Sequence, residues 1–214
     1  MRLASKGKQT AQHAKNVGSP DLLNALVVAS YGRHFLARDA EGEIWQVYGK
    51  GKRRDVAVGD EISILPSGDK QAWIEEIQTR RNLVYRSDAL KSKMFAANLD
   101  GVLLMLAISP PYSTELLGRT LTACKHADVP LTILFNKVDI LEGDQETLDA
   151  VEQELFEITL GEVPTHYISV TEHPQETEAL LRPLLADKRT LILGQSGMGK
   201  STLIKTINAL EPFQ

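Results

Sequence analysis

Residues 190–202 read Thr-Leu-Ile-Leu-Gly-Gln-Ser-Gly-Met-Gly-Lys-Ser-Thr, and this stretch decides the fold. It fits the phosphate-binding pattern G-x-x-x-x-G-K-[ST] at Gly194, Gly199, Lys200 and Ser201. A short apolar run precedes the motif and apolar residues at helical spacing follow it, which predicts a strand, a loop and a helix. Glycines let successive backbone N–H groups point at an anion above a helix N-terminus. An ordinary glycine-rich turn is the alternative, but the strand and helix around it favour a phosphate site.

The phosphate motif predicts specific roles for its polar side chains. Lys200 is expected to reach the β- and γ-phosphates and to serve as the catalytic cation, while the Ser201 hydroxyl is expected to bind Mg²⁺. The residues predicted to surround the phosphates are Gly194, Gln195, Ser196, Gly197, Met198, Gly199, Lys200, Ser201 and Thr202.

A second nucleotide motif lies upstream, where Asn136-Lys137-Val138-Asp139 fits the pattern N-K-x-D after a predicted buried strand. The Asp139 carboxylate can accept hydrogen bonds from guanine N1–H and the N2 amine, which adenine does not present, so discrimination can be large. Asn136 is expected to tie the loop together and reach the base edge, and the Lys137 stem to pack on the base plane. The sequence therefore predicts a guanine site. An ATPase or kinase with a coincidental N-K-x-D is the alternative.

A third loop is expected to complete the base site. The predicted strand at 165–168 ends at Ser169-Val170-Thr171, whose backbone N–H groups are expected to reach guanine O6. Alanine is usual after this serine, so Val170 departs from the pattern. His166 and His173 flank the loop and are interpreted as surface or core residues.

Composition is that of a globular protein of 214 residues, with 43% hydrophobic and 24% charged residues. The single cysteine, Cys124, excludes an internal disulfide, suits a reducing cytoplasm and is interpreted as a core residue. No apolar stretch reaches the length of a transmembrane helix, so no membrane contact is expected. The net charge of −4 hides an acidic segment at 141–187 and a basic one at 1–20. The basic segment is expected to be a disordered tail, either solvated or bound to an anionic partner such as nucleic acid.

Residues 21–79 carry short β-type runs separated by turn residues, which predicts an all-β OB-fold barrel. The expected strands are 22–30, 33–38, 43–48, 61–65 and 72–78. Most aromatic residues here are expected to fill the barrel. A cationic loop is the candidate RNA contact, through Lys50, Lys52, Arg53 and Arg54.

Residues 80–97 are predicted to be a basic linker, either flexible or in contact with phosphate. From 98 to 214 strands and helices alternate, which predicts a parallel sheet with helices on both faces. Its expected strands are 101–108, 131–135, 165–168 and 191–193, and the expected helices before the phosphate loop are 113–127, 147–160 and 176–185. This segment is interpreted as an incomplete α/β P-loop GTPase domain.

Motif order is the most specific feature. In ordinary GTPases the phosphate loop precedes N-K-x-D; here the order is reversed, so the domain is predicted to be circularly permuted. A small barrel followed by such a domain resembles the ribosome small-subunit-dependent GTPase family RsgA (YjeQ). The runs Ala97-Asn98-Leu99-Asp100 and Ser109-Pro110-Pro111, Arg119, and the phosphate loop (with Met198 where valine is usual) support the resemblance.

The resemblance implies a cytoplasmic bacterial GTPase, monomeric, that uses GTP/GDP and Mg²⁺ and binds the small ribosomal subunit late in maturation. Hydrolysis would be stimulated by that subunit, and the barrel would contact 16S rRNA. A non-catalytic RNA- or ribosome-binding module with a vestigial nucleotide site is the alternative.

The family also has three features that this sequence lacks between Ser201 and Gln214. They are a switch threonine, a D-x-x-G segment and a C-terminal domain that binds Zn²⁺. The chain is either shortened relative to the family or continues beyond Gln214. The 214 residues are expected to bind guanine nucleotide weakly and to hydrolyse GTP little or not at all. The four strands are expected to form one contiguous sheet with 191–193 on its edge.

Overall fold

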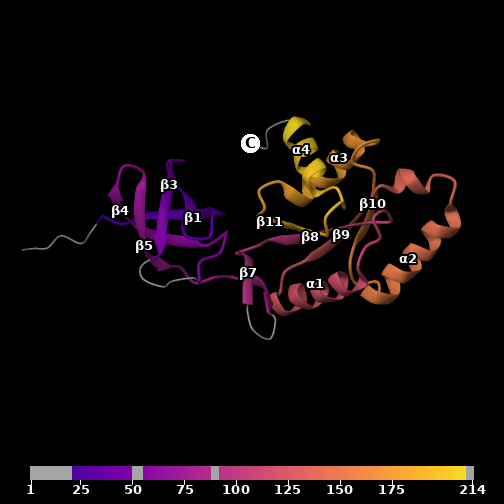
Figure 1. Ribbon diagram of the computed structural model, residues 1–214, viewed down its shortest axis with the longest axis horizontal. Helices are drawn as coiled ribbons and strands as arrows, with labels where there is room; N and C mark the ends of the chain where they lie inside the picture. Colours follow the sequence, from indigo (N-terminus) through magenta and orange to yellow (C-terminus); the bar gives the residue numbers. More distant parts are fainter. Residues whose placement is uncertain (1–20, 50–54, 88–91, 211–214) are drawn as a thin grey trace, which may run out of the picture.

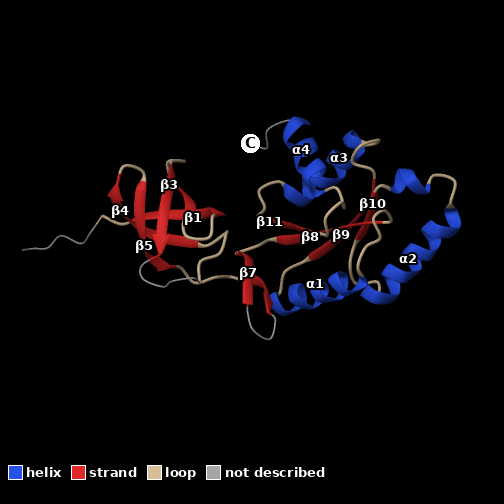
Figure 2. Ribbon diagram, viewed as in Figure 1, coloured by secondary structure: helices blue, strands red, loops and turns tan. Residues whose placement is uncertain are grey.

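The computed structural model describes residues 21–49, 55–87 and 92–210. They form a small barrel, a hairpin and a parallel sheet covered by helices (Figures 1 and 2). The predicted tail at 1–20 and the candidate RNA-binding residues Lys50, Lys52, Arg53 and Arg54 lie outside the described residues.

The barrel is built from five strands, as expected for an OB-type fold. They are β1 (Leu23–Ser30), β2 (Phe35–Asp39), β3 (Ile44–Gly49), β4 (Glu61–Gly68) and β5 (Gln71–Ile77). The strand order is β1-β2-β3-β5-β4, and antiparallel pairing of β1 with β4 closes the barrel. Alternate residues fill the interior, with Val27, Val47 and Ile74 fully buried, because side chains alternate between the two faces of a strand. The predicted OB-type barrel is therefore confirmed.

The segment predicted as a basic linker is a two-stranded hairpin, which corrects that prediction. It consists of β6 (Leu83–Ser87) and β7 (Ser92–Ala97). Val84 and Ala96 are buried in the same core as helix α1 (Thr114–Ala127), while Arg86 and Lys93 are exposed. Exposed cations such as Arg86 and Lys93 suggested a linker and concealed the buried positions of the same two strands.

Beyond the hairpin, the remaining elements alternate strand and helix. They are β8 (Gly101–Ala107), α1, β9 (Leu131–Asn136), a short 3-10 helix η1 (Val138–Leu141), α2 (Gln145–Thr159), β10 (Thr165–Ile168), α3 (Pro174–Leu185), β11 (Thr190–Leu193) and α4 (Lys200–Leu210). The four strands pair in parallel in the order β10-β9-β8-β11. The contiguous sheet with residues 191–193 on its edge is confirmed.

Strand β8 shows why the sheet has a core on each side. Val102, Leu104 and Leu106 pack with α1 and α2. The alternate residues Leu103 and Met105 pack with α3 and α4. A strand covered by helices on both faces has no polar side, which explains its continuous apolar sequence. Cys124, on α1, is 1% exposed and is a core residue as predicted; burial raises the pKa of its thiol to about 11.

Named contacts join the barrel to the α/β domain. The Ala97 N–H donates to Val58 O and the Asn98 side-chain amide to Gly59 O, both at 2.8 Å. Gly59 has a φ of +90°, and a Cβ there would lie 2.1 Å from the carbonyl oxygen of Ala97. This close approach explains why a glycine follows Val58. Across the described ranges, no helix is long and apolar enough to cross a membrane.

Candidate nucleotide site

Three loops at the carboxyl edge of the sheet form the candidate site. They follow β9, β10 and β11 and carry, in turn, the N-K-x-D motif, Ser169 and the phosphate motif. In an open parallel sheet, ligands bind outside the carboxyl ends of the strands. Because β8 separates β9 from β11, the base-reading loop and the phosphate loop lie on either side of the central strand.

The phosphate loop takes its shape from the backbone. Gly194 and Gly199 have φ values of +148° and +101°. A Cβ at Gly194 would lie 2.5 Å from Met105 O, and one at Gly199 would lie 2.3 Å from the Asn136 amide nitrogen. Only glycine fits such a backbone at such distances. These two positions therefore need glycine both for conformation and for space.

Lys200 lies at the start of α4 and bonds to its own loop. Its ammonium donates to Gly194 O at 2.7 Å and to Gln195 O at 2.5 Å. The loop curls around this cation, which places positive charge beside the N-terminus of α4, where an anion is also favoured by the helix dipole. Met198 is 1% exposed and packs in the core on the α3–α4 side of the sheet.

The residues present fit a magnesium ion bound together with a nucleotide. Ser201 is exposed in the first turn of α4, directly after Lys200. Mg²⁺ keeps several waters and takes phosphate oxygens, so a single serine hydroxyl is an adequate protein ligand. In the described part of the chain, no group of three or more His, Cys, Asp or Glu residues could hold a metal ion. Mg²⁺ at this position would therefore take most of its ligands from the phosphates of the nucleotide and from water.

Asn136 joins all three loops. Its amide nitrogen donates to Met198 O in the phosphate loop at 2.9 Å, and its amide oxygen accepts from the Val170 N–H at 3.1 Å. The side chain is 3% exposed. The contacts agree with the predicted tie, and the burial leaves little surface for the predicted reach to the base edge.

Asp139 is oriented by a residue of the next loop. The Ser169 hydroxyl donates to Asp139 Oδ1, and Ser169 itself is 2% exposed. Sequence reasoning assigned Ser169 only a backbone role and missed this bond. The strand register would have predicted this bond. Ile168 pairs with Asn136, so Ser169 lies next to the base-reading loop. The Val170 N–H, predicted for guanine O6, is instead bonded to Asn136.

The segment after β8 contacts both loops, which sequence reasoning did not predict. Lys137 has a left-handed backbone with φ of +67°, and its ammonium donates to Ser109 O at 2.6 Å. At the other end, the Ser113 N–H donates to the Gln195 side-chain oxygen at 2.8 Å. Between them, Tyr112 donates to Glu154 on α2; burial and this bond raise the pKa of the phenol. Residues 109–113 thus brace the phosphate loop against α1 and α2.

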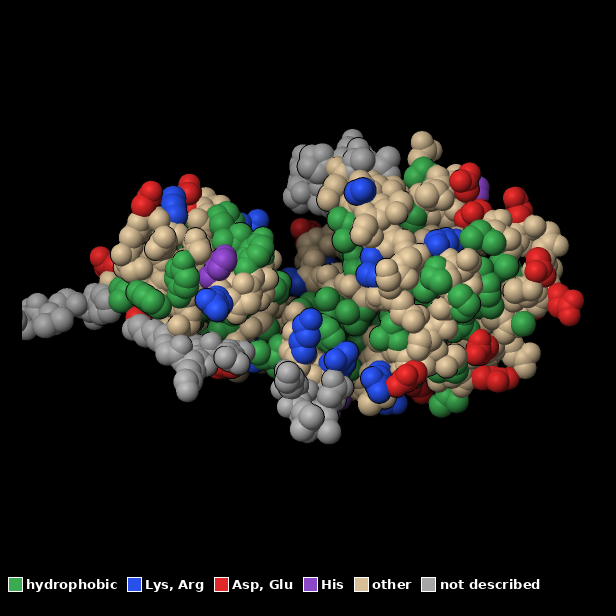
Figure 3. Space-filling model, in the orientation of Figure 1, with side chains coloured by type: hydrophobic (Ala, Val, Ile, Leu, Met, Phe, Trp, Pro, Cys, Tyr) green, Lys and Arg blue, Asp and Glu red, His purple; other side chains and the backbone are tan. Residues whose placement is uncertain are grey.

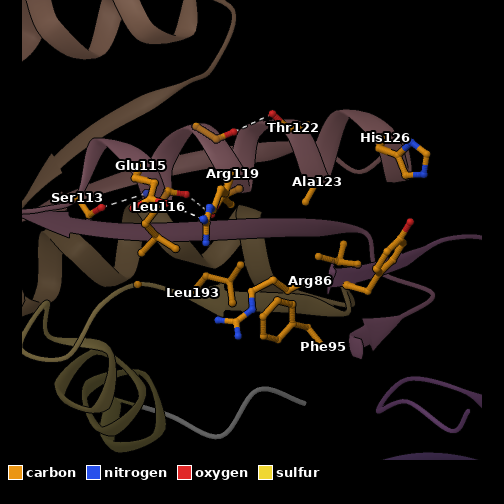
Figure 4. A pocket seen from close by; sticks show the side chains of 15 residues that line it. Arg86, Phe95, Ser113, Glu115, Leu116, Arg119, Thr122, Ala123, His126 and Leu193 are labelled. Atoms are coloured by element: carbon orange, nitrogen blue, oxygen red, sulfur yellow. Dashed lines mark hydrogen bonds and ion pairs between the residues drawn. The ribbon is translucent and has the colours of Figure 1, made fainter. Parts of the chain in front are cut away.

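A cleft of about 900 Å³ lies beside the phosphate loop (Figure 4). The hairpin, α1 and the end of β11 line it, with Arg86, Phe95 and Leu193 on one side and Arg119 on α1. Gly194 is the one phosphate-loop residue in its lining, whereas Asp139 and Lys200 do not line it. The cleft therefore lies next to the candidate nucleotide site, along the edge of β11.

A closed OB-type barrel is followed by a parallel-sheet P-loop domain whose base-reading loop precedes its phosphate loop. This motif order is that of the circularly permuted P-loop GTPases. A family model described as RsgA GTPase matches residues 77–212. The chain belongs to the RsgA GTPase family.

Curated relatives carry the same family name. The chain is 39% identical over 189 residues to the small ribosomal subunit biogenesis GTPase RsgA of Bordetella pertussis, covering 88% of this chain and 61% of that protein. It is 41% identical over 198 residues to the protein of the same name from Paraburkholderia phytofirmans, covering 91% and 60%. The chain thus spans about three fifths of the length of these relatives.

Solved structures share the fold. The crystal structure of YjeQ from Thermotoga maritima matches with a TM-score of 0.65 at 26% identity, covering 87% of this chain and 65% of that one. The structure of YloQ, a circularly permuted GTPase, matches with a TM-score of 0.61 at 23% identity, covering 94% and 68%. The predicted permuted fold is confirmed.

Proposed function

We propose that this chain binds guanine nucleotide and acts as a GTPase in biogenesis of the small ribosomal subunit. One observation carries the nucleotide part: the 2.9 Å bond from Asn136 to Met198 O, which joins two motifs 62 residues apart in the chain. A coincidental N-K-x-D would have no reason to bond to a phosphate loop. The names of the curated relatives support the ribosomal part.

In this proposal each loop has a separate task. Asp139, oriented by Ser169, accepts the N1–H and N2 hydrogen bonds of guanine. Lys200 moves from its own loop carbonyls to the β- and γ-phosphates, and Ser201 is a ligand of Mg²⁺. Bound Mg²⁺ would neutralise phosphate charge, which is the main electrostatic requirement of phosphoryl transfer.

The proposed partner is the small ribosomal subunit, contacted at 16S rRNA by the barrel, in the cytoplasm. The barrel has an OB-type topology, and such barrels commonly present a face to oligonucleotides. Lys50, Lys52, Arg53 and Arg54 remain the predicted cationic contact, directly after β3 in the sequence.

Calorimetry with GDP, ADP and XDP tests the nucleotide assignment. GDP is expected to bind at least about 100-fold more tightly than ADP, because adenine would cover the Asp139 carboxylate without offering it the two donors of guanine, which is costly. Asp139→Asn is expected to weaken GDP and to strengthen XDP, whereas Asp149→Asn on α2 provides a matched control. Equal binding of ADP and GDP by the parent protein would show that the base assignment is wrong.

Ribosome pelleting tests the switch role. Association of the parent protein with small subunits is expected to depend on guanine nucleotide, and Lys200→Ala is expected to remove that dependence. If Lys200→Ala leaves a nucleotide-dependent association unchanged, the proposed switch role is wrong. Association of the parent protein that does not depend on nucleotide would favour a non-catalytic binding module. Little or no GTP hydrolysis by these 214 residues remains a prediction, which a phosphate-release assay with and without small subunits checks.

A further inference from the structure

Four rings form a continuous line on the outside of the barrel, here called the aromatic row: Tyr31, His34, Tyr48 and Trp73. Tyr31 and His34 are stacked, with ring centroids 5.3 Å apart and planes 15° apart. The His34 and Tyr48 centroids are 6.1 Å apart, and those of Tyr48 and Trp73 are 5.7 Å apart. The row therefore crosses the barrel from the β1–β2 turn over β3 to β5.

Strand register explains why these rings face outward. Tyr48 pairs with Trp73 across the parallel β3–β5 ladder, and the preceding pair, Val47 and Ala72, is fully buried. Since side chains alternate along a strand, burial of Val47 and Ala72 turns Tyr48 and Trp73 to the surface. In Figure 3 this part of the molecule shows exposed hydrophobic side chains around a histidine.

The aromatic row does not fill the barrel, which corrects the expectation that most aromatic residues of this segment do. None of its four members belongs to the barrel core, which consists of aliphatic residues and Phe35. Tyr31 is 60% exposed and Trp73 is 40% exposed, and His34 and Tyr48 are half-buried. Exposed aromatic residues at the centre of a surface commonly mark a binding site. The row is thus an exposed aromatic surface that packing of the barrel core does not account for.

We propose that the aromatic row binds unpaired RNA bases by stacking. Every base has a π-face, so a line of rings accepts successive bases of a single strand with little dependence on sequence. Paired bases in an A-form helix cannot offer their faces, so recognition of duplex RNA relies on shape and phosphate contacts instead. Arg33, exposed between Tyr31 and His34, places a cation beside the row for the backbone phosphates. The inference rests on the proposed RNA-facing role of the barrel and specifies the form of RNA.

Fluorescence anisotropy on the full chain tests the row, with a labelled single-stranded RNA of about twelve nucleotides and a duplex of equal length. Trp73→Ala is expected to weaken single-strand binding by about 5-fold or more and to change duplex binding by less than about 2-fold. Tyr31→Ala is expected to act in the same direction. Phe156→Ala provides the matched control, because Phe156 is a 65% exposed aromatic residue on α2, outside the barrel.

The outcomes separate the row from the proposed function. Equal effects of Trp73→Ala and Phe156→Ala on single-strand binding would overturn the stacking inference, as would equal losses for single strand and duplex. If the parent protein binds neither RNA, the stacking inference is wrong, whatever the effect of Trp73→Ala on small-subunit pelleting. Urea denaturation of each variant, measured alongside, shows whether its barrel folds. If the parent protein does not select guanine nucleotides, the proposed function is contradicted, while the inference about the aromatic row is still decided by the RNA measurements.

Discussion

The two halves of the candidate nucleotide site are stabilised in different ways. The phosphate loop takes its form from glycine backbone angles, and its lysine bonds to main-chain oxygens of the same loop. The base-reading loop takes its form from side chains, since Asn136 and Ser169 each connect it to a neighbouring loop. A change of backbone geometry is therefore expected to disturb the whole phosphate loop. In the base-reading loop, a substitution can remove one polar side chain and leave the other contacts in place.

The difference predicts which substitutions abolish binding and which alter selectivity. Backbone N–H groups carry no information about the base, so damage to the phosphate loop weakens all nucleotides alike. Side-chain carboxylates and hydroxyls distinguish one base from another. Of the following four changes, the first three test this division and the fourth tests a contact outside the site. They run from the largest expected effect to the smallest.

Gly199→Ala is expected to cause the largest loss. A residue with a Cβ is strained at φ of +101°, and that Cβ would meet the Asn136 amide nitrogen at 2.3 Å. Calorimetry is expected to show affinity for GDP and GTP reduced by about 100-fold or more. Gly118→Ala in α1, where a Cβ meets nothing within 4 Å, is the control and is expected to raise stability by about 0.5–1 kcal/mol. Retained GDP affinity in Gly199→Ala would contradict the backbone account.

Asn136→Ala is expected to affect both halves, because it leaves Met198 O and the Val170 N–H without their shared partner. Two buried polar groups left unsatisfied cost about 2–4 kcal/mol in the free energy of unfolding. Urea denaturation measures this loss, and Asn208→Ala on the exposed face of α4 is the matched control. A change below about 0.5 kcal/mol would show that the tie between loops contributes little.

Ser169→Ala is expected to act on selectivity more than on affinity. Without the Ser169 hydroxyl, Asp139 loses the group that orients its carboxylate. The preference for GDP over IDP, which lacks the N2 amine, is expected to fall by about 10-fold, while affinity for IDP changes little. Competition binding with the two nucleotides measures the ratio. An equal loss of affinity for GDP and IDP would show that Ser169 only maintains the shape of the loop and does not contribute to base selectivity.

Asp100→Asn tests a smaller effect at the opposite end of β11 from the phosphate loop. The Arg189 backbone N–H, and then the Arg81 guanidinium, hold the pKa of Asp100 below its ordinary value. A depressed carboxyl pKa stabilises the fold above about pH 4, and this contribution is lost as pH falls through the folded-state pKa. The parent protein is expected to exceed Asp100→Asn in the free energy of unfolding by up to about 1 kcal/mol at pH 7. A difference that stays the same below pH 3 would contradict the prediction.

Much of the fold follows from local pattern. The barrel strands alternate with period two, which indicates one covered face. The continuous apolar run of β8 indicates two covered faces. The hairpin at residues 83–97 escaped this reasoning because its exposed cations dominate its composition, although Val84 and Ala96 are buried. At the candidate site, motif spacing predicted Asp139 and Lys200, but no spacing rule connects Ser113 to Gln195, which are 82 residues apart.

The sequence by itself determined the two nucleotide motifs, their reversed order and the alternation of strand and helix, because each depends on residues close together in the chain. The tertiary structure alone decided which residues of different loops bond. Asn136 reaches Met198, Ser169 reaches Asp139, and Tyr48 lies beside Trp73 only because strand order and register bring them together. These contacts depend on which strands are neighbours, and local sequence does not specify neighbours across a sheet.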